Sequence, residues 1–264
     1  MIKKTFFIGI LTSIILFSCK QDEIEPKVLV ANFETTITGE APSCQITISN
    51  KSENASSYNW TFSEGANFST STNETPETLT VDKTGNFTIT LTVSDGTTEK
   101  EITKTISITG HNAIVEYSDL EFALNAGNDT YGRLYSFETN KMYLDSEITN
   151  DNGSKIHLAF SSMGGTMYYF DSPSNNDYSV PNATVTKVIN YENTPTISSS
   201  DFNDMVDDRL LVELTIADDN NSFGNSSIPG NTVLFEISTG KKGVIITKAV
   251  NNDRLLVDIK IQKY

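Results

Sequence analysis

The sequence predicts an all-β protein built from β-sandwich domains, and three observations support this prediction. Apolar and polar residues alternate along many short segments, which is the period of a strand with one buried face. Ser, Thr, Gly and Asn occur frequently, whereas long helices would need more Ala, Leu, Glu and Lys. A length of 264 residues fits two folded units better than one. We expect at most one short helix.

The charge of the chain excludes one class of partner. The formal net charge is -15 at pH 7, so a nucleic acid would be repelled at long range. Nucleic acid is therefore not an expected partner. Acidity of this kind suits a soluble protein beside a negatively charged cell surface, and spread carboxylates can collect divalent cations.

Residues 1–18 have the pattern of an export signal. Lys3 and Lys4 supply the positive start, and the apolar stretch 6–17 is too short to span a bilayer as a stable anchor. We therefore predict a signal peptide that is removed after export, and not a transmembrane helix.

The segment that ends this stretch, Leu-Phe-Ser-Cys at 16–19, resembles the lipobox of bacterial lipoproteins, although Phe17 is less common at its position than a smaller residue. The resemblance implies that Cys19 is acylated and anchors the protein to a membrane through lipid. Residues 20–23, Lys-Gln-Asp-Glu, resemble the acidic export signal of Bacteroidota-type surface lipoproteins. This implies an outer-membrane protein exposed at the cell surface, with 19–27 as a lipidated linker.

Residues 28–110 form the first predicted domain. Strand-like alternation occurs at 28–33, 45–49, 57–62, 86–93 and 104–108. Asp95-Gly96 between two alternating segments is typical of a hairpin turn.

The segments 48–52, 57–62, 85–93 and 104–108 together resemble the PKD domain, an immunoglobulin-like β-sandwich. The resemblance covers about 80 residues and implies a spacer or interaction module. The chain departs from the family at 61–65, where Thr-Phe-Ser-Glu-Gly replaces the usual acidic turn. Trp60 could stack on a sugar, but it shares a strand face with Tyr58 and Phe62, which favours the core.

Residues 113–264 form the second predicted domain, after a junction at His111 and Asn112. A short helix is expected after Ser200, with a capping hydroxyl and acidic residues in its first turn. The rest indicates a larger β-sandwich or jelly-roll of about eight strands. Segments 135–143, 154–160 and 170–173 are similar to carboxyl-terminal domains of other surface lipoproteins, for which no chemistry is implied. The predicted strands are 114–124, 132–136, 141–143, 155–160, 166–170, 210–216, 232–237, 241–250 and 255–262.

Aromatic residues near 168–182 are the candidate ligand contacts. Tyr168, Tyr169, Tyr178 and Asp171 could form a carbohydrate-binding face, because flat rings match the C–H faces of sugars and polar groups bind the hydroxyls. Alternation along a strand leaves at most Tyr169 and Tyr178 free for this. The alternative is that these rings belong to the core.

The segment 218–224 offers oxygen ligands at alternate positions before a glycine. Asp218, Asn220 and Ser222 are therefore candidate ligands for Ca²⁺, although the distal glutamate of the twelve-residue calcium loop is missing. An Asp/Asn-rich hairpin turn is the competing interpretation. No other cofactor is expected.

Catalytic motifs are absent from the sequence. The two histidines, His111 and His157, form no zinc motif, no serine lies in a Gly-x-Ser-x-Gly turn, and there is no phosphate-binding glycine loop. Cys44 is expected to be a small buried apolar side chain.

These observations favour a non-catalytic surface lipoprotein. In this interpretation a spacer domain presents a β-domain that binds a glycan or a protein partner. Two alternatives remain open: a glycan hydrolase of unusual type that uses carboxylates, and a purely structural or assembly lipoprotein.

Overall fold

The computed structural model describes residues 27–128, 130–219 and 221–264. The all-β prediction is confirmed, because the strands form four antiparallel sheets and the longest α-helix of the described residues has six residues. The predicted signal peptide, Cys19 and the linker up to residue 26 lie outside the described residues. No described helix has the length and apolar character needed to cross a membrane.

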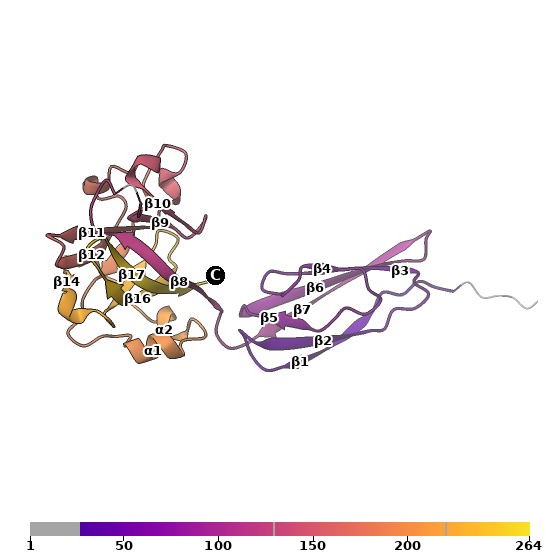
Figure 1. Ribbon diagram of the computed structural model, residues 1–264. Coiled ribbons are helices and arrows are strands. Elements are labelled where there is room, and N and C mark those ends of the chain that lie inside the picture. Colours follow the sequence, from indigo (N-terminus) through magenta and orange to yellow (C-terminus); the bar gives the residue numbers. More distant parts are fainter. Residues whose placement is uncertain (1–26, 129, 220) are drawn as a thin grey trace, which may run out of the picture.

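The first unit is a sandwich of a three-stranded sheet, β1-β2-β5, and a four-stranded sheet, β4-β3-β6-β7 (Figure 1). Trp60 is fully buried between them, packs edge-on against Phe33 at 5.3 Å and donates its indole N–H to the Asn73 carbonyl. Cys44 is buried in the same core, as expected. The strands are β1 Phe33–Thr38, β2 Cys44–Asn50, β3 Ser57–Phe62, β4 Thr70–Ser71, β5 Leu79–Val81, β6 Gly85–Ser94 and β7 Glu99–Ile108.

The Asp-Gly turn joins β6 to β7, as predicted. Ser94 pairs with Glu99, and the Asp95 carboxylate accepts the backbone N–H groups of Thr97 and Thr98. These bonds hold the pKa of Asp95 far below its usual range. Gly96 supplies the positive φ of 96° that the turn requires.

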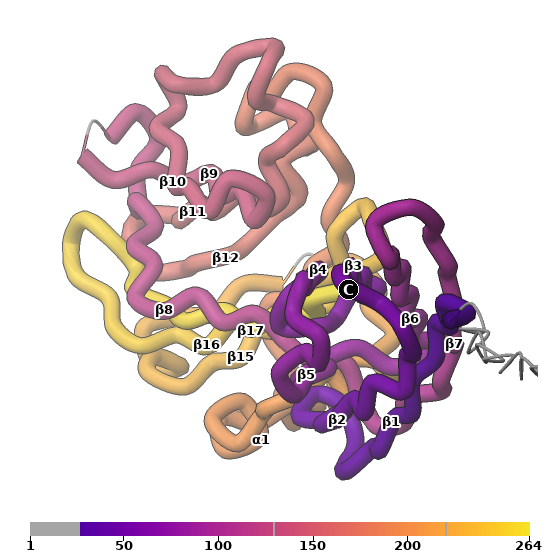
Figure 2. Tube along the Cα trace, turned by 90° about the vertical axis from the view of Figure 1, so that its right-hand side faces the viewer, coloured from indigo at the N-terminus to yellow at the C-terminus, as the bar shows by residue number. Residues whose placement is uncertain are grey.

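The second unit is a sandwich of two five-stranded sheets, β10-β9-β11-β12-β14 and β13-β15-β16-β17-β8. Figure 2 shows them as two layers, with the labels β9–β12 above those of β8 and β15–β17. One core lies between them: most of its residues from the first sheet are aromatic, and the second sheet adds aliphatic residues together with Phe122 and Phe235. The strands are β8 Ile114–Ala123, β9 Leu134–Ser136, β10 Lys141–Tyr143, β11 Leu158–Met163, β12 Met167–Asp171, β13 Lys187–Ile189, β14 Phe223–Gly224, β15 Thr232–Glu236, β16 Lys242–Val250 and β17 Arg254–Gln262.

Two short α-helices cover the outer face of the second sheet, so the prediction of at most one helix was wrong. In α1, Ser199–Asp204, the N-cap is Ser198, which forms a capping box with Asp201, and Phe202 packs inward. The second helix is α2, Arg209–Val212. The structure also contains the 3-10 turns η1 Asp145–Glu147, η2 Gly153–Lys155, η3 Asn176–Tyr178 and η4 Asn225–Ser227.

The strand predicted at 210–216 was also wrong, because this segment contains α2. Its apolar residues pack with helical spacing: Leu211 is buried and Leu214 is partly buried on the same core cluster. Leu210 and Val212, which a strand would have placed together on one face, are both exposed. Lys242 donates to the carbonyls of Val212 and Leu214, where the helical turn ends.

Three further differences concern strand positions. The strand predicted at 28–33 begins only at Phe33; before it, Val30 makes an isolated bridge to Glu53. The strand predicted at 155–160 begins at Leu158, because η2 occupies the preceding residues. The strands β4, β5, β13 and β14, each of two or three residues, were not predicted.

Hydrogen bonds connect the two units at residue 112 and at the carboxyl-terminal end. The Asn112 side chain accepts from the backbone N–H and hydroxyl of Thr84 and donates to the buried Asp208 carboxylate. Lys263 and Tyr264 both donate to Asp82 of the first unit. The junction is therefore a bonded contact and not only a tether.

Candidate functional site

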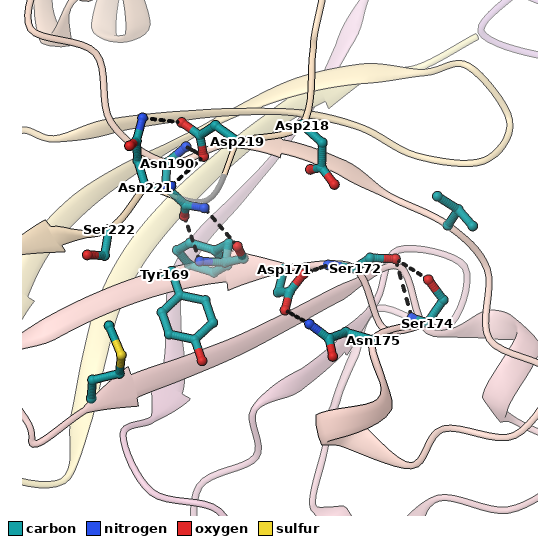
Figure 3. Close-up of a pocket in the computed structure, with 13 residues that line it drawn as sticks. Tyr169, Asp171, Ser172, Ser174, Asn175, Asn190, Asp218, Asp219, Asn221 and Ser222 are labelled. Carbon is teal, nitrogen blue, oxygen red and sulfur yellow. Dashed lines mark hydrogen bonds between the residues drawn. The ribbon is translucent and has the colours of Figure 1, made fainter.

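An open cavity of about 510 Å³ lies at the edge of the β9–β12 sheet in the second unit. It is formed by the end of β12, the turn that follows it, the end of β13 and the segment before β14 (Figure 3). The cavity therefore brings together the predicted carbohydrate face and the predicted calcium segment, which are about 50 residues apart in the chain. The lining residues are Met163, Tyr169, Phe170, Asp171, Ser172, Ser174, Asn175, Val185, Asn190, Asp218, Asp219, Asn221 and Ser222.

Strand alternation decides which tyrosine reaches the cavity. Tyr168 and Phe170 point into the sandwich core, and the Tyr168 hydroxyl donates to the Gly165 carbonyl and lies 2.6 Å from the Asn225 amide oxygen. Tyr169, between them, points the other way, is partly exposed and lines the cavity. Of the two tyrosines of β12, only Tyr169 is placed to contact a ligand; Tyr168 is a core residue.

Tyr178 is also buried, so the prediction that its ring is free was wrong. It packs with Leu134 and Tyr143 on the outer side of the sheet, and the Arg133 guanidinium lies 4.8 Å from its ring centroid. Its hydroxyl has no hydrogen-bond partner among the described residues. The turn after β12 folds this ring inward and leaves the polar residues Ser174 and Asn175 at the surface.

Asn190 builds the inner end of the cavity. Its buried side-chain amide accepts from the Phe170 N–H at 2.7 Å and donates to the Phe170 carbonyl at 2.9 Å. The amide thus satisfies both backbone groups of Phe170, as a neighbouring strand would. This continues the sheet beyond β14, which pairs with β12 only at Met167 and Tyr168.

Asp218 and Asp219 are held by the free edge of β13. Asp218 accepts the Val188 N–H at 2.7 Å, and Asp219 accepts the Asn190 N–H at 3.2 Å. Asp219 also accepts from the side-chain amide of Asn221 at 2.9 Å. The segment is therefore fixed by carboxylate-to-backbone bonds, and each carboxylate still faces the cavity (Figure 3).

The surroundings of Asp171 shift its pKa. It accepts from the Ser172 N–H and from the Asn175 side-chain amide, both at 2.7 Å. Burial raises the pKa of Asp171, and the nearby charges of Asp218 and Asp177 raise it further. The three cavity carboxylates are not offset by any lining Lys, Arg or His. An anionic ligand would be repelled here, whereas a neutral hydroxyl-rich or a cationic ligand would not.

The predicted calcium ligands are only partly placed. Asp218 and Ser222 both line the cavity, and Asn220 lies outside the described residues. One oxygen of Asp218 already accepts the Val188 N–H. Within the part of the chain that the structure describes, no three His, Cys, Asp or Glu side chains lie close enough together to hold a metal ion. Calcium binding stays a prediction.

Sequence reasoning missed several lining residues that lie in irregular segments. Asn175, Asn190, Asp219 and Asn221 reach the cavity through turns whose course the local pattern does not define. Asn190 gave no signal either, because β13, the strand that it directly follows, was not predicted.

Fold and cavity define a two-unit all-β protein with an acidic, partly aromatic cavity at a sheet edge. A crystal structure of a DUF4466 family protein from Parabacteroides merdae is similar to 89% of this chain and 99% of that one, with a TM-score of 0.45 and 12% identity. No protein-family model and no curated protein matches the chain.

Proposed function

We propose that this protein is a non-catalytic binding protein of the bacterial cell surface whose second unit binds a glycan. One observation carries the proposal: the cavity combines the partly exposed ring of Tyr169 with carboxylate, amide and hydroxyl side chains and lacks any lining cation. A ring offers an apolar face to the C–H groups of a sugar, and the polar groups bind its hydroxyls. A volume of about 510 Å³ lies in the range of small-ligand sites.

The remaining parts of the proposal come from the amino-terminal sequence. The lipobox-like segment supports acylation of Cys19 and attachment to the outer membrane, and the acidic residues after it support exposure at the cell surface. The first unit, a three-plus-four-stranded sandwich with a PKD-like sequence pattern, then serves as a spacer. Together these parts would hold the glycan-binding unit away from the membrane.

A glycan array tests the ligand class, and it should be run with and without a chelator. We expect binding to neutral glycans. Binding that survives the chelator would show that no cation takes part. Tyr169→Ala should weaken the affinity for the best glycan at least about tenfold, which corresponds to 1.4 kcal/mol. The matched control is Tyr191→Ala, an exposed tyrosine that does not line the cavity. Equal affinity of both variants and wild type would reject this site.

A second candidate function, glycan hydrolysis, is favoured by one observation. Two carboxylates, Asp171 with a raised pKa and Asp218, line the same cavity, as the acid and base of a glycosidase do. Against it, both oxygens of Asp171 accept hydrogen bonds, which stabilise the ionised form. Release of reducing sugar from a panel of polysaccharides, abolished by Asp171→Asn, would establish hydrolysis in place of binding.

A further inference from the structure

A second cavity, of about 340 Å³, lies at the end of the second unit that faces the junction. It is formed by β8, the turn between β9 and β10, the residue before β11, the turn between β15 and β16, and the end of β17. It shares no lining residue with the acidic cavity. Its lining residues are Val115, Tyr117, Phe137, Glu138, His157, Ile237, Thr239, Lys241, Ile261, Gln262 and Lys263.

His157 presents a hydrogen-bond donor in this cavity. The side chain is about nine-tenths buried, and its Nδ1 accepts the backbone N–H of Phe137 at 3.1 Å. The proton of the neutral ring therefore resides on Nε2. No described residue accepts a hydrogen bond from Nε2. Burial lowers the pKa of His157, so the ring stays a neutral donor at pH 7. Because His157 lines the cavity, its Nε2–H can donate to an acceptor atom of a ligand there.

Two further donors line the same cavity. The Lys241 ammonium donates one hydrogen bond, to the Lys263 carbonyl at 2.6 Å, and among the described residues it forms no ion pair. The Tyr117 hydroxyl has no hydrogen-bond partner within the described segments, and burial raises its pKa so that it keeps its proton. Three side chains thus offer unused donors to one space.

The charge balance of the cavity favours an anion. Glu138 is the lining carboxylate, and it pairs with Lys155 at 3.2 Å. Lys263 is likewise paired, with Asp82 at 2.6 Å. Lys241 is the lining lysine that forms no ion pair with a described residue. A small anion would supply its missing partner.

The other walls of the cavity are apolar. Val115, Ile237 and Ile261 contribute aliphatic surface, and the Phe137 ring stacks on Phe235 with centroids 5.5 Å apart. Phe137 also contacts Tyr117 and His157 through their rings. A ligand that satisfies the whole lining therefore needs an acceptor group at one end and an apolar body.

We propose that this cavity is a binding site for a small carboxylate with an apolar body. The carboxylate accepts hydrogen bonds from Lys241 Nζ and His157 Nε2, and the body lies against Phe137 and the neighbouring aliphatic side chains. The site is independent of the glycan site, and the two cavities have opposite preferences for charge.

Benzoate is a suitable probe, with benzyl alcohol as its uncharged counterpart. The protein contains two histidines, so ¹⁵N-histidine labelling gives a simple spectrum in which the exposed His111 serves as internal reference. Titration at pH 7 and constant ionic strength should shift the His157 Nε2 signal saturably and leave His111 unchanged. Benzyl alcohol should bind at least about tenfold more weakly, the equivalent of 1.4 kcal/mol.

Two variants with the same change of charge separate the site from general electrostatics. Lys241→Gln should weaken benzoate binding at least about tenfold. Lys187→Gln, at a lysine paired with Glu236 outside the cavity, should not change it. A His157 signal that does not move, equal affinity for benzyl alcohol, or equal loss in both variants would overturn the proposal. The wild-type comparison of the two probes stands even if Lys241→Gln does not fold.

Discussion

Replacing Asn190 by Leu should destabilise the second unit strongly, because one side chain completes the sheet at the acidic cavity. Asn190 is buried, and its amide forms both hydrogen bonds to the backbone of Phe170. Leucine has a similar volume and no polar atoms. The variant therefore leaves the N–H and the carbonyl of Phe170 without partners while it keeps the packing close to that of the wild type.

The magnitude follows from the two backbone groups. A buried polar group that loses its partner costs about 1–3 kcal/mol, so the two together predict a loss of about 2–6 kcal/mol in the free energy of unfolding. With a urea m value of about 2 kcal/mol/M, the midpoint should fall by about 1–3 M. Asn175→Ala is the matched control. This exposed amide lines the same cavity, but it donates only to the Asp171 carboxylate and accepts only from the Asp177 backbone N–H.

The assay can separate the two units because the chain has a single tryptophan. Trp60 lies in the core of the first unit, so its fluorescence reports the unfolding of that unit, whereas circular dichroism reports both. We expect Asn190→Leu to lower the midpoint of the transition seen by dichroism and to leave the fluorescence midpoint in place. A loss of less than about 1 kcal/mol, equal to that expected for Asn175→Ala, would refute the role assigned to Asn190.

Three further predictions concern other buried groups. Burial lowers the pKa of His157, so the unfolded chain takes up a proton at a higher pH than the folded chain, and stability should decrease as the pH falls below about 6.5. Thermal melts of wild type and His157→Asn at pH 7.5 and 5.5 test this. An equal change of melting temperature between the two pH values in both proteins would contradict it. Burial raises the pKa of the Cys44 thiol, so iodoacetamide should label it only after unfolding, as peptide mapping would show; rapid labelling of the folded protein argues against a core position. Gly243→Ala places a Cβ 2.3 Å from the Phe235 ring, so denaturation should reveal a loss of about 1–3 kcal/mol, and unchanged stability would show that the ring can move.

The long strands were predictable from the sequence because alternation alone defines them. In β6, Phe87, Ile89, Leu91 and Val93 are buried and the residues between them are not, as a half-buried strand requires. The same rule failed at 210–216, where every second residue is apolar but the chain turns into α2. There the decisive contacts are distant ones, from Lys242 and from the bonds between Asn112 and Asp208, and no local pattern encodes them.

The candidate site was half predictable for a similar reason. Alternation correctly selected Tyr169 over Tyr168 as the exposed ring of β12. It could not locate Tyr178, because the turn that buries this ring has no regular period. The meeting of Asp171 with Asp218 was also beyond local reasoning, since it depends on how the segment before β14 binds the edge of β13.

Methionine methyl resonances test the glycan site most directly. The chain has five methionines. Met163 lines the acidic cavity and is exposed, whereas Met205, the residue after α1, is buried in the core. Addition of the glycan that binds best on the array should shift the ¹³C-methyl signal of Met163, identified through Met163→Leu, and leave that of Met205 in place. A bound glycan that leaves Met163 unshifted would contradict the proposal that this cavity is where the protein binds its ligand.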